Sequence, residues 1–417
     1  MGPCFRRDDN KIKHKHTGDE AMKITGIETL HCDAGFRVNS FVKITTDEGI
    51  TGWSEFMEGY GSLGLAGVVE KLGEQLIGQD PRPVEVISRT LYATTIQAPG
   101  GMNAQAIAAI ENALVDIKAK ALGIPVYELL GGPYRDRLQV YWSHCGSWRA
   151  RHADTVREMC GVEPVRSLDD IVKLGAEVKR RGFKGLKTNI IRFDGGKPSM
   201  YHPGTGSGPG FPELNINKDI LDMAVAQLAA FREGAGPDVG MHLDTNFNYK
   251  IDGYIQIARA LEQFNMVWLE IDLFEPAALA TIRRSARTPI ASLESVYGRR
   301  GFRPYFEQQS VDYAIIDVAW NGILESVKIA ALADSFEVNC APHNFNGHLG
   351  SLISAHFCAS IPNFKVMEID IDDVTWKDDI VTVPPVLKDG HFLLPTAAGW
   401  GADVNEEFVR AHPPKRR

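Results

Sequence analysis

Three acidic residues stand at the ends of consecutive short apolar runs. Asp244 ends VGMHLD, Glu270 ends VWLE and Glu294 ends IASLE. They are 26 and 24 residues apart, about one strand plus one helix, so a barrel of such repeats would bring all three to its catalytic mouth. One such acid alone is more often a helix cap or a loop charge. Three converging carboxylates repel one another unless a cation lies between them, and oxygen ligands suit Mg²⁺, so the set predicts a magnesium site.

An acid–base pair follows on the next two apolar runs. Asp317 ends YAIID and His343 follows VNCAP one repeat later, so adjacent strands would carry them. An Asp beside a His holds the imidazole tautomer and stabilises the imidazolium, which makes His343 a competent general base and then a general acid. Glu368 ends the last apolar run, where it could hydrogen-bond a substrate oxygen.

A lysine and an asparagine lie two residues apart in GLKTNII. A strand would point Lys187 and Asn189 into the same mouth. Lys187 could neutralise a substrate carboxylate; the alternative is a lysine that faces solvent. A proton next to a carboxylate is far less acidic than an imidazolium, so the metal and Lys187 must stabilise a doubly charged enediolate more than they stabilise the substrate. These residue types therefore favour proton abstraction beside a carboxylate.

The elements that must hold these residues alternate along most of the chain. Eight short apolar strands separated by helical stretches begin near Leu138 and predict a (β/α)8 barrel. Ahead of them we expect an α+β unit, with a hairpin that turns at residues 47–49 and a helix from Ala104 to Leu122. The expected segments are a flexible extension (1–21), the α+β unit (22–137), the barrel (138–375) and a C-terminal segment (376–417) that returns to the α+β unit through a hairpin.

Composition is that of a soluble globular protein. The 417 residues carry a formal net charge of -8, which argues against a nucleic-acid partner. No apolar run reaches the roughly 18 residues that span a bilayer, and residues 1–21 lack the apolar stretch of a secretory signal. The six cysteines form no CxxC pair, which is typical of reduced thiols. We expect a cytoplasmic protein without a membrane or nucleic-acid partner.

These motifs resemble the mandelate racemase subgroup of the enolase superfamily. The stretch AIAAIENALVDIKAKALGIPVYELLGG is similar to a signature of that family. LDTN at Asp244, WLE at Glu270 and LES at Glu294 match its three metal-ligand strands. IDVAWNGI at Asp317 and APHNFNGHLGSLISAH at His343 match its Asp–His dyad.

The resemblance runs from about residue 22 to residue 395. It implies an α/β fold in which an α+β capping domain, built from both ends of the chain, covers a modified (β/α)7β barrel. It implies Mg²⁺ on the three carboxylates, His343 as general acid/base and Asp317 as its partner. Cap loops near residues 32–39 and 60–65 would help to choose the substrate. The residues that we expect to bind substrate are Ser143, His144, Asn189, Asn246 and Glu368.

Three departures from the family pattern bear on the reaction. The family usually has Lys-x-Lys where this chain has Lys187-Thr188-Asn189, and Asn189 cannot carry a proton. A racemase needs a proton carrier on each face of the carbanion, whereas a dehydratase can use His343 alone, which takes the α-proton and returns it to the departing β-hydroxyl. The second departure is Ile271 after Glu270, where the family usually has Glu or Asp, and the third is Leu293, where it often has Gly. Neither departure removes a predicted metal ligand.

We therefore predict a Mg²⁺-dependent dehydratase that converts an aldonate or aldarate into a 2-keto-3-deoxy acid. The alternatives are a racemase or epimerase of a 2-hydroxy acid, with Lys187 as a conceivable second base, and a binding protein without activity. Phosphoryl chemistry is disfavoured because no P-loop is present. The resemblance implies a homo-oligomer, from dimer to octamer. Residues 151–171 and 192–214 do not fit a minimal barrel and suggest a lid or an assembly contact.

Overall fold

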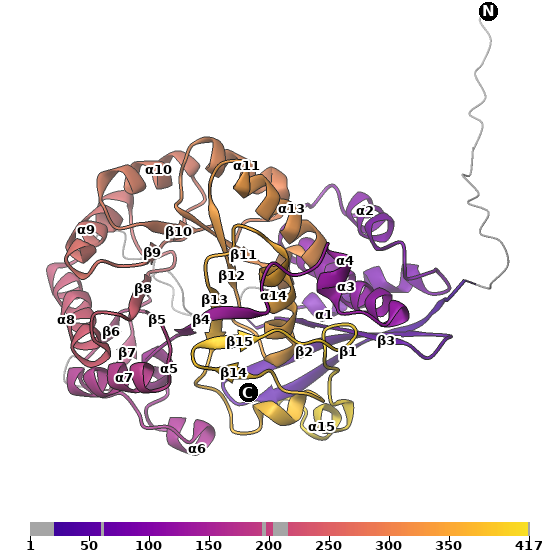
Figure 1. The fold of residues 1–417 in the computed structure, drawn as a ribbon, viewed down its shortest axis with the longest axis horizontal. Helices are drawn as coiled ribbons and strands as arrows, with labels where there is room; N and C mark the ends of the chain where they lie inside the picture. The colour runs from indigo at the N-terminus through magenta and orange to yellow at the C-terminus, as the bar shows by residue number, and fades with distance from the viewer. Residues whose placement is uncertain (1–20, 60–61, 194–196, 203–215, 416–417) are drawn as a thin grey trace, which may run out of the picture.

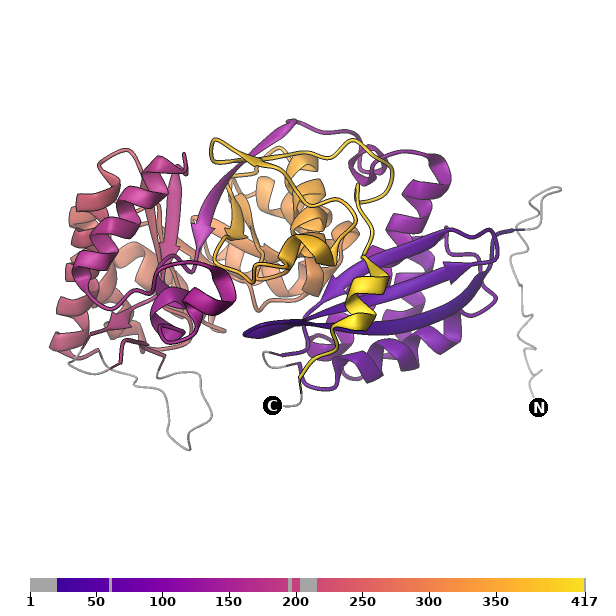
Figure 2. The same ribbon diagram turned by 90° about the horizontal axis from the view of Figure 1, so that it is seen from below.

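The computed structural model places the chain in two packed parts, an α+β unit and a barrel that lies beside it (Figure 1 and Figure 2). It describes residues 21–59, 62–193, 197–202 and 216–415. Nearly all of the predicted extension, much of the 192–214 segment and part of the expected 60–65 loop lie outside the described residues. No helix in the described part of the chain is long and apolar enough to cross a membrane.

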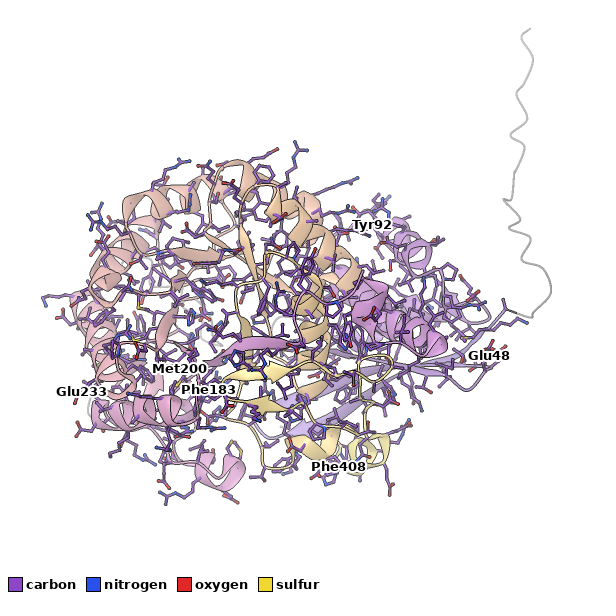
Figure 3. All side chains as sticks on the ribbon, viewed as in Figure 1. Glu48, Tyr92, Phe183, Met200, Glu233 and Phe408 are labelled. Carbon is purple, nitrogen blue, oxygen red and sulfur yellow. The ribbon has the colours of Figure 1, made fainter. Side chains whose placement is uncertain are left out.

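The α+β unit is an antiparallel sheet with helices on one face (Figure 2). Its strands pair in sequence order: β1 (Ile24–Ala34), β2 (Arg37–Thr46) and β3 (Thr51–Phe56). Its longer helices are α1 (Leu65–Gly73), α2 (Val84–Thr94) and α3 (Gly101–Leu122). The expected turn between β2 and β3 contains Gly49 at φ 77°, and the adjacent Glu48 lies at the end farthest from the barrel (Figure 3). A Cβ on Gly52 would lie 2.1 Å from the Ala113 carbonyl oxygen, so glycine lets β3 pack closely on α3.

The larger part is a barrel of eight parallel strands within the described residues, closed where β13 pairs with β4. In order around the barrel they are β4 (Arg137–Ser143), β5 (Gly185–Thr188), β8 (Gly240–Asp244), β9 (Trp268–Glu270), β10 (Ile290–Ser292), β11 (Tyr313–Asp317), β12 (Asn339–His343) and β13 (Met367–Asp370). Large side chains such as Trp142 and Trp268 are fully buried.

Helices cover the outside of the barrel after every strand except the last (Figure 1). They are α7 (Leu168–Arg180), α8 (Lys218–Ala235), α9 (Ile251–Leu261), α10 (Pro276–Ser285), α11 (Gly298–Glu307), α13 (Ile323–Asp334) and α14 (His348–Ser360). In the described residues β13 leads to a short 3-10 turn and a hairpin instead of a barrel helix. The expected (β/α)7β arrangement is confirmed.

The hairpin that we expected to return to the α+β unit joins the barrel instead. Its strands are β14 (Leu387–Lys388) and β15 (His391–Leu393), and β15 pairs antiparallel with β4. The chain returns to the α+β unit only after this hairpin. There α15 (Glu406–Ala411) lies beside β1 and β2, with Arg410 2.8 Å from Glu28 and Lys43 2.7 Å from Glu406.

The irregular segments contain short elements near the barrel mouth. In the 151–171 region, α5 (Ser147–Arg151) and α6 (Val156–Cys160) follow β4. In the 192–214 region, β6 (Ile191–Arg192) and β7 (Ser199–Met200) form a two-stranded hairpin after β5.

Buried hydrogen bonds join the α+β unit to the mouth end of the barrel. Asn112 on α3 donates to the Val318 carbonyl at 3.2 Å and accepts from the Ile323 amide at 2.9 Å, just after β11. Glu55 on β3 accepts from the amides of Gly347 and Gly350 at 2.5 and 2.8 Å, at the start of α14. These bonds place the α+β unit next to the strand ends that carry the predicted dyad.

Candidate active site

The three predicted metal ligands stand at the carboxyl ends of neighbouring strands. Asp244 lies opposite Glu270 in the β8–β9 register, and Glu294 follows two residues after the end of β10. Asp244 and Glu270 are buried, with 6% and 1% of their surface exposed. Leu293 adopts φ 97°, a backbone conformation that is strained for any residue with a side chain. Glycine would adopt this conformation without strain, and here the turn before Glu294 forms with leucine.

Lys187 lies between the acids, as expected for a residue that faces the mouth. Its ammonium nitrogen is 2.7 Å from Glu368, 3.2 Å from Glu270 and 3.6 Å from Asp244. Burial works against its charge, but Glu270 and Glu368 raise the pKa of Lys187 well above its usual value. A lysine held protonated in this way is a source of positive charge and a poor proton acceptor.

The carboxylates fit a divalent cation in donor type and in charge. In the part of the chain that the structure describes, no three His, Cys, Asp or Glu side chains already surround a single point as a ligand set, and Lys187 contacts two of the predicted ligands. Burial nevertheless raises the pKa of Glu270 to about 8, against the attraction of Lys187 and with repulsion from Asp244 and Glu294. Such mutual repulsion is relieved by a cation, and all-oxygen ligation suits Mg²⁺.

The predicted dyad is formed. Asp317 and His343 lie opposite each other in the β11–β12 register, and Asp317 Oδ2 is 2.6 Å from His343 Nδ1. The other Asp317 oxygen accepts from the Trp320 amide at 2.9 Å, which fixes the carboxylate. Burial opposes the charge of the imidazole, but Glu294 and Asp317 raise the pKa of His343 well above its usual value. His343 Nε2 is 3.5 Å from Glu294 Oε2 and therefore faces the carboxylates.

Glu368 and Ser143 lie together across β13 and β4. Ser143 Oγ donates to Glu368 Oε1 at 2.5 Å, and the Asn344 amide donates to Oε2 at 2.8 Å. Burial opposes ionisation, but Lys187 and His343 lower the pKa of Glu368 far below its usual value. Glu368 is therefore an ionised anchor for the lysine, with both oxygens engaged by the protein.

His144 lies beside this anchor at the end of β4. Its Nδ1 is 2.9 Å from Asp370 Oδ1, and its ring lies 5.1 Å from those of Trp148 and Phe345. Asp370 also lines a cavity of about 230 Å³, and none of the predicted site residues lines it.

The two predicted asparagines flank Asp244. Asn189 Nδ2 donates to the Asp244 carbonyl at 3.2 Å, and the Asn246 amide donates to Asp244 Oδ1 at 3.0 Å. Asn246 adopts φ 47°, a conformation that asparagine tolerates better than most residues. Every predicted site residue thus lies at one mouth of the barrel, and their catalytic roles stay predictions.

Two titratable residues near these groups were missed from the sequence. Asp272 is buried two residues beyond Glu270, and burial together with Glu294 and Asp244 raises its pKa well above the usual value. Its spacing from Glu270 could have revealed it. His202 contacts Asn246, and burial lowers its pKa. No spacing rule could have found His202, because it precedes no barrel strand.

Comparison with known proteins agrees with this geometry. Residues 170–408 match the family model for the enolase C-terminal domain-like region, and residues 34–131 match the model for the mandelate racemase / muconate lactonizing enzyme N-terminal domain. The chain belongs to the mandelate racemase / muconate lactonizing enzyme family. This membership confirms the resemblance that the strand-end motifs indicated.

Relatives of the chain within the family carry names from two reaction types. The chain is 31% identical to a D-galactonate dehydratase of Pectobacterium atrosepticum, over 93% of this chain and 94% of the relative. It is 27% identical to a D-xylonate dehydratase of Haloferax volcanii, over 96% of this chain and 91% of the relative. A solved structure from Burkholderia xenovorans strain LB400, provisionally assigned as an L-alanine-DL-glutamate epimerase, contains magnesium and fumarate. It is 46% identical to this chain with a TM-score of 0.91, over 94% of this chain and 96% of that one.

Proposed function

We propose that this family member is a magnesium-dependent dehydratase of an acid sugar, an aldonate or aldarate, and forms a 2-keto-3-deoxy acid. The observation that carries the proposal is the Asp317–His343 dyad, whose 2.6 Å contact leaves Nε2 facing the carboxylates. Relatives named for the dehydration of D-galactonate and D-xylonate, aligned over more than nine tenths of the chain, support the choice of reaction and substrate class.

The proposed reaction begins with binding of the substrate carboxylate near Lys187. A Mg²⁺ ion held by Asp244, Glu270 and Glu294 would supply further positive charge for the two carboxylate oxygens. Lys187 is fixed by Glu368 at 2.7 Å, so its charge is in place before the substrate arrives. Charge that is positioned in advance stabilises the enediolate more than the substrate, because the negative charge on these oxygens doubles when the α-proton leaves.

His343 then acts on the α-proton. Asp317 holds Nδ1, so Nε2 is the nitrogen that takes the proton. The resulting imidazolium is stabilised by Asp317, which is itself fixed by the Trp320 amide. Loss of the β-hydroxyl as water then gives an enol, which becomes the 2-keto-3-deoxy acid.

Epimerisation is the second candidate, and the solved relative with 46% identity supports it. An epimerase needs a proton carrier on the face opposite His343. At the position of the family's second lysine this chain has Asn189, which carries no proton, and Lys187 is held protonated by Glu270 and Glu368. These two residues favour dehydration.

The test is a screen of the purified protein with Mg²⁺ against a panel of aldonic and aldaric acids that includes D-galactonate and D-xylonate. Semicarbazide detects 2-keto acids. Keto acid formation supports the proposal and identifies the substrate. Epimer formation in D₂O, with deuterium at the α-carbon and no keto acid, would instead favour the epimerase.

We further propose that the protein acts in the cytoplasm as a homo-oligomer. The cysteines in the described residues are all free thiols, which fits a reducing compartment. Sedimentation equilibrium tests the assembly, and a mass of one chain at micromolar concentration would contradict it.

A further inference from the structure

We propose that His202 is a second proton-transferring residue, which protonates the departing β-hydroxyl from the side of the substrate opposite His343. The proposal rests on the function proposed above and adds a residue to it. His202 lies in the irregular 192–214 segment, outside the barrel strands.

A short hairpin brings His202 to the barrel mouth. β6 and β7 pair antiparallel, and the Tyr201 amide donates to the Ile190 carbonyl at 2.8 Å. One further step in this register places His202 across from Asn189, the position where the family usually has its second lysine. Met200 of β7, labelled in Figure 3, marks the hairpin on the side of the barrel formed by β5 and α7.

The surroundings of the His202 ring are residues of the mouth. Its side chain hydrogen-bonds to that of Asn246, and the charges of Asp244, Arg151 and His144 act on it. These residues come from the ends of β8, α5 and β4, so the imidazole lies over the same opening as the carboxylates. Its Nδ1 is buried and has no hydrogen-bond partner among the described residues. A buried ring nitrogen without a partner calls for an explanation, and a substrate hydroxyl at this position would supply one.

The order of the strands places the two histidines on opposite sides of the barrel. His343 ends β12, whereas His202 lies beside Asn246, just after β8. In the closed barrel three strands separate β8 from β12 on one side, β9 to β11, and three on the other, β13, β4 and β5 (Figure 1). A substrate held between Lys187 and the carboxylates would therefore have one histidine on each side.

This arrangement suits an anti elimination. His343 takes the α-proton, and the electron pair of the broken C–H bond forms the C=C bond of the enol. The C–O bond at the β-carbon breaks, and the oxygen leaves as water with a proton from the His202 imidazolium. The enol becomes the 2-keto-3-deoxy acid, and proton exchange with solvent resets both histidines.

The two histidines differ in the way that the two steps require. His343 has a carboxylate partner that stabilises its imidazolium after it takes a proton from carbon. In the described part of the chain no carboxylate hydrogen-bonds to His202, whose ring contacts a neutral amide. Such an imidazolium gives its proton to a departing oxygen more readily.

The first experiment separates proton abstraction from loss of the hydroxyl. His202→Asn and wild type are incubated with Mg²⁺ and D-galactonate or D-xylonate in D₂O. We expect keto acid formation to fall by roughly 10²-fold or more in the variant, while α-hydrogen exchange, which depends on His343, continues. Ser199→Ala, an exposed change in the same hairpin, should retain both activities.

The second experiment removes the need for the proton. A 3-deoxy-3-fluoro analogue of the acid that is turned over loses fluoride, which leaves without protonation. We expect His202→Asn to release fluoride within a few-fold of wild type, whereas His343→Asn should not. Melting temperature and Mg²⁺ affinity of His202→Asn, measured in parallel, should match those of wild type.

The outcomes distinguish this proposal from the proposed function. Equal dehydration rates of wild type and His202→Asn would overturn the role of His202 and leave the proposed function intact. So would a His202→Asn variant whose activity falls by the same factor on the natural acid and on the fluoro analogue. Wild type that forms an epimer and no keto acid would overturn both and would make His202 the second base of an epimerase. Wild type inactive on the whole panel would reject both.

Discussion

At the scale of single residues, the site balances many buried negative charges with few positive ones. Lys187 is the cation closest to Glu270 and Glu368, which hold it charged. A divalent cation would add to this positive charge, and the dyad and the predicted metal ligands can be changed separately by mutation because they lie on different strands. The dyad residues lie on β11 and β12, while the predicted ligands come from β8 to β10.

We predict that His343→Asn lowers dehydration by roughly 10²–10⁴-fold, because it removes the imidazole that Asp317 holds with Nε2 toward Glu294. Mg²⁺ affinity, measured by calorimetry, should remain near that of wild type because His343 is not a predicted ligand. Activity close to wild type would remove this histidine from the mechanism.

We predict that Glu294→Gln weakens Mg²⁺ binding at least tenfold, about 1.4 kcal/mol, because a neutral amide replaces an anionic ligand. Calorimetry measures the affinity directly and does not depend on activity. The matched control is Glu307→Gln, the same change at an exposed position on α11. Unchanged affinity of Glu294→Gln would reject this residue as a ligand.

At the scale of elements, a buried arginine helps to hold the β1–β2 hairpin of the capping domain against the barrel. The Arg37 guanidinium lies 3.3 Å from Asp370, the last residue of β13, and 2.6 Å from Asp373, three residues beyond it. Its neighbour Phe36 stacks on Trp148 with ring centroids 4.6 Å apart. Because Asp370 also binds His144, the placement of the cap hairpin is connected to the end of β4.

We predict that Arg37→Met destabilises the protein by about 3–5 kcal/mol, because it removes the buried guanidinium that Asp373 and Asp370 share and leaves them only Lys377 and His144. Hydrogen exchange should rise first in residues 33–38. Arg82→Met, which removes an exposed ion pair with Asp80, should change stability by less than about 1 kcal/mol. Equal effects of the two variants would show that the buried contacts of Arg37 do not hold the hairpin.

At the scale of the whole molecule, the cap and the barrel meet where the mouth is built. Glu55 and Asn112 of the cap bind the starts of α14 and α13, the helices that follow β12 and β11. The cap thus supports the dyad strands, and Gln105 on α3 also donates to the Tyr297 hydroxyl at 2.8 Å, three residues after Glu294. Because the cap and the barrel meet at the mouth, we expect metal binding and the protonation of the mouth carboxylates to change the free energy of unfolding of the whole chain.

We predict that metal-free protein loses stability as the pH rises from about 4.5 toward 8. The pKa of Glu270 is raised to about 8 in the folded chain, so its protonated form stabilises the fold at low pH and this contribution disappears as the pH passes 8. Mg²⁺ should offset part of the decline, adding about 2.7 kcal/mol at 100 times its dissociation constant. Thermal unfolding of wild type and Glu270→Gln, with and without Mg²⁺, measures this; the same decline in Glu270→Gln would contradict it.

The sequence determined the barrel, its strand order and the residues at its mouth. Eight apolar strands at a regular repeat leave few alternatives for burial, and the parallel strands bring Asp244, Glu270 and Glu294 to one edge. The dyad followed from the same repeat. These are consequences of periodicity, which a sequence displays directly.

Tertiary structure decided what periodicity does not encode. The β14–β15 hairpin joined the first residues of β4, which precede those that pair with β13 and β5 and so were open to an antiparallel partner. Lys187 proved to be bound by Glu270 and Glu368, a pairing between strands far apart in the sequence. His202 lies at the mouth because the two short strands β6 and β7 pair in a register that carries the chain back toward Asn189. Contacts between distant segments depend on how the strands close in space, and for that reason only the folded chain shows them.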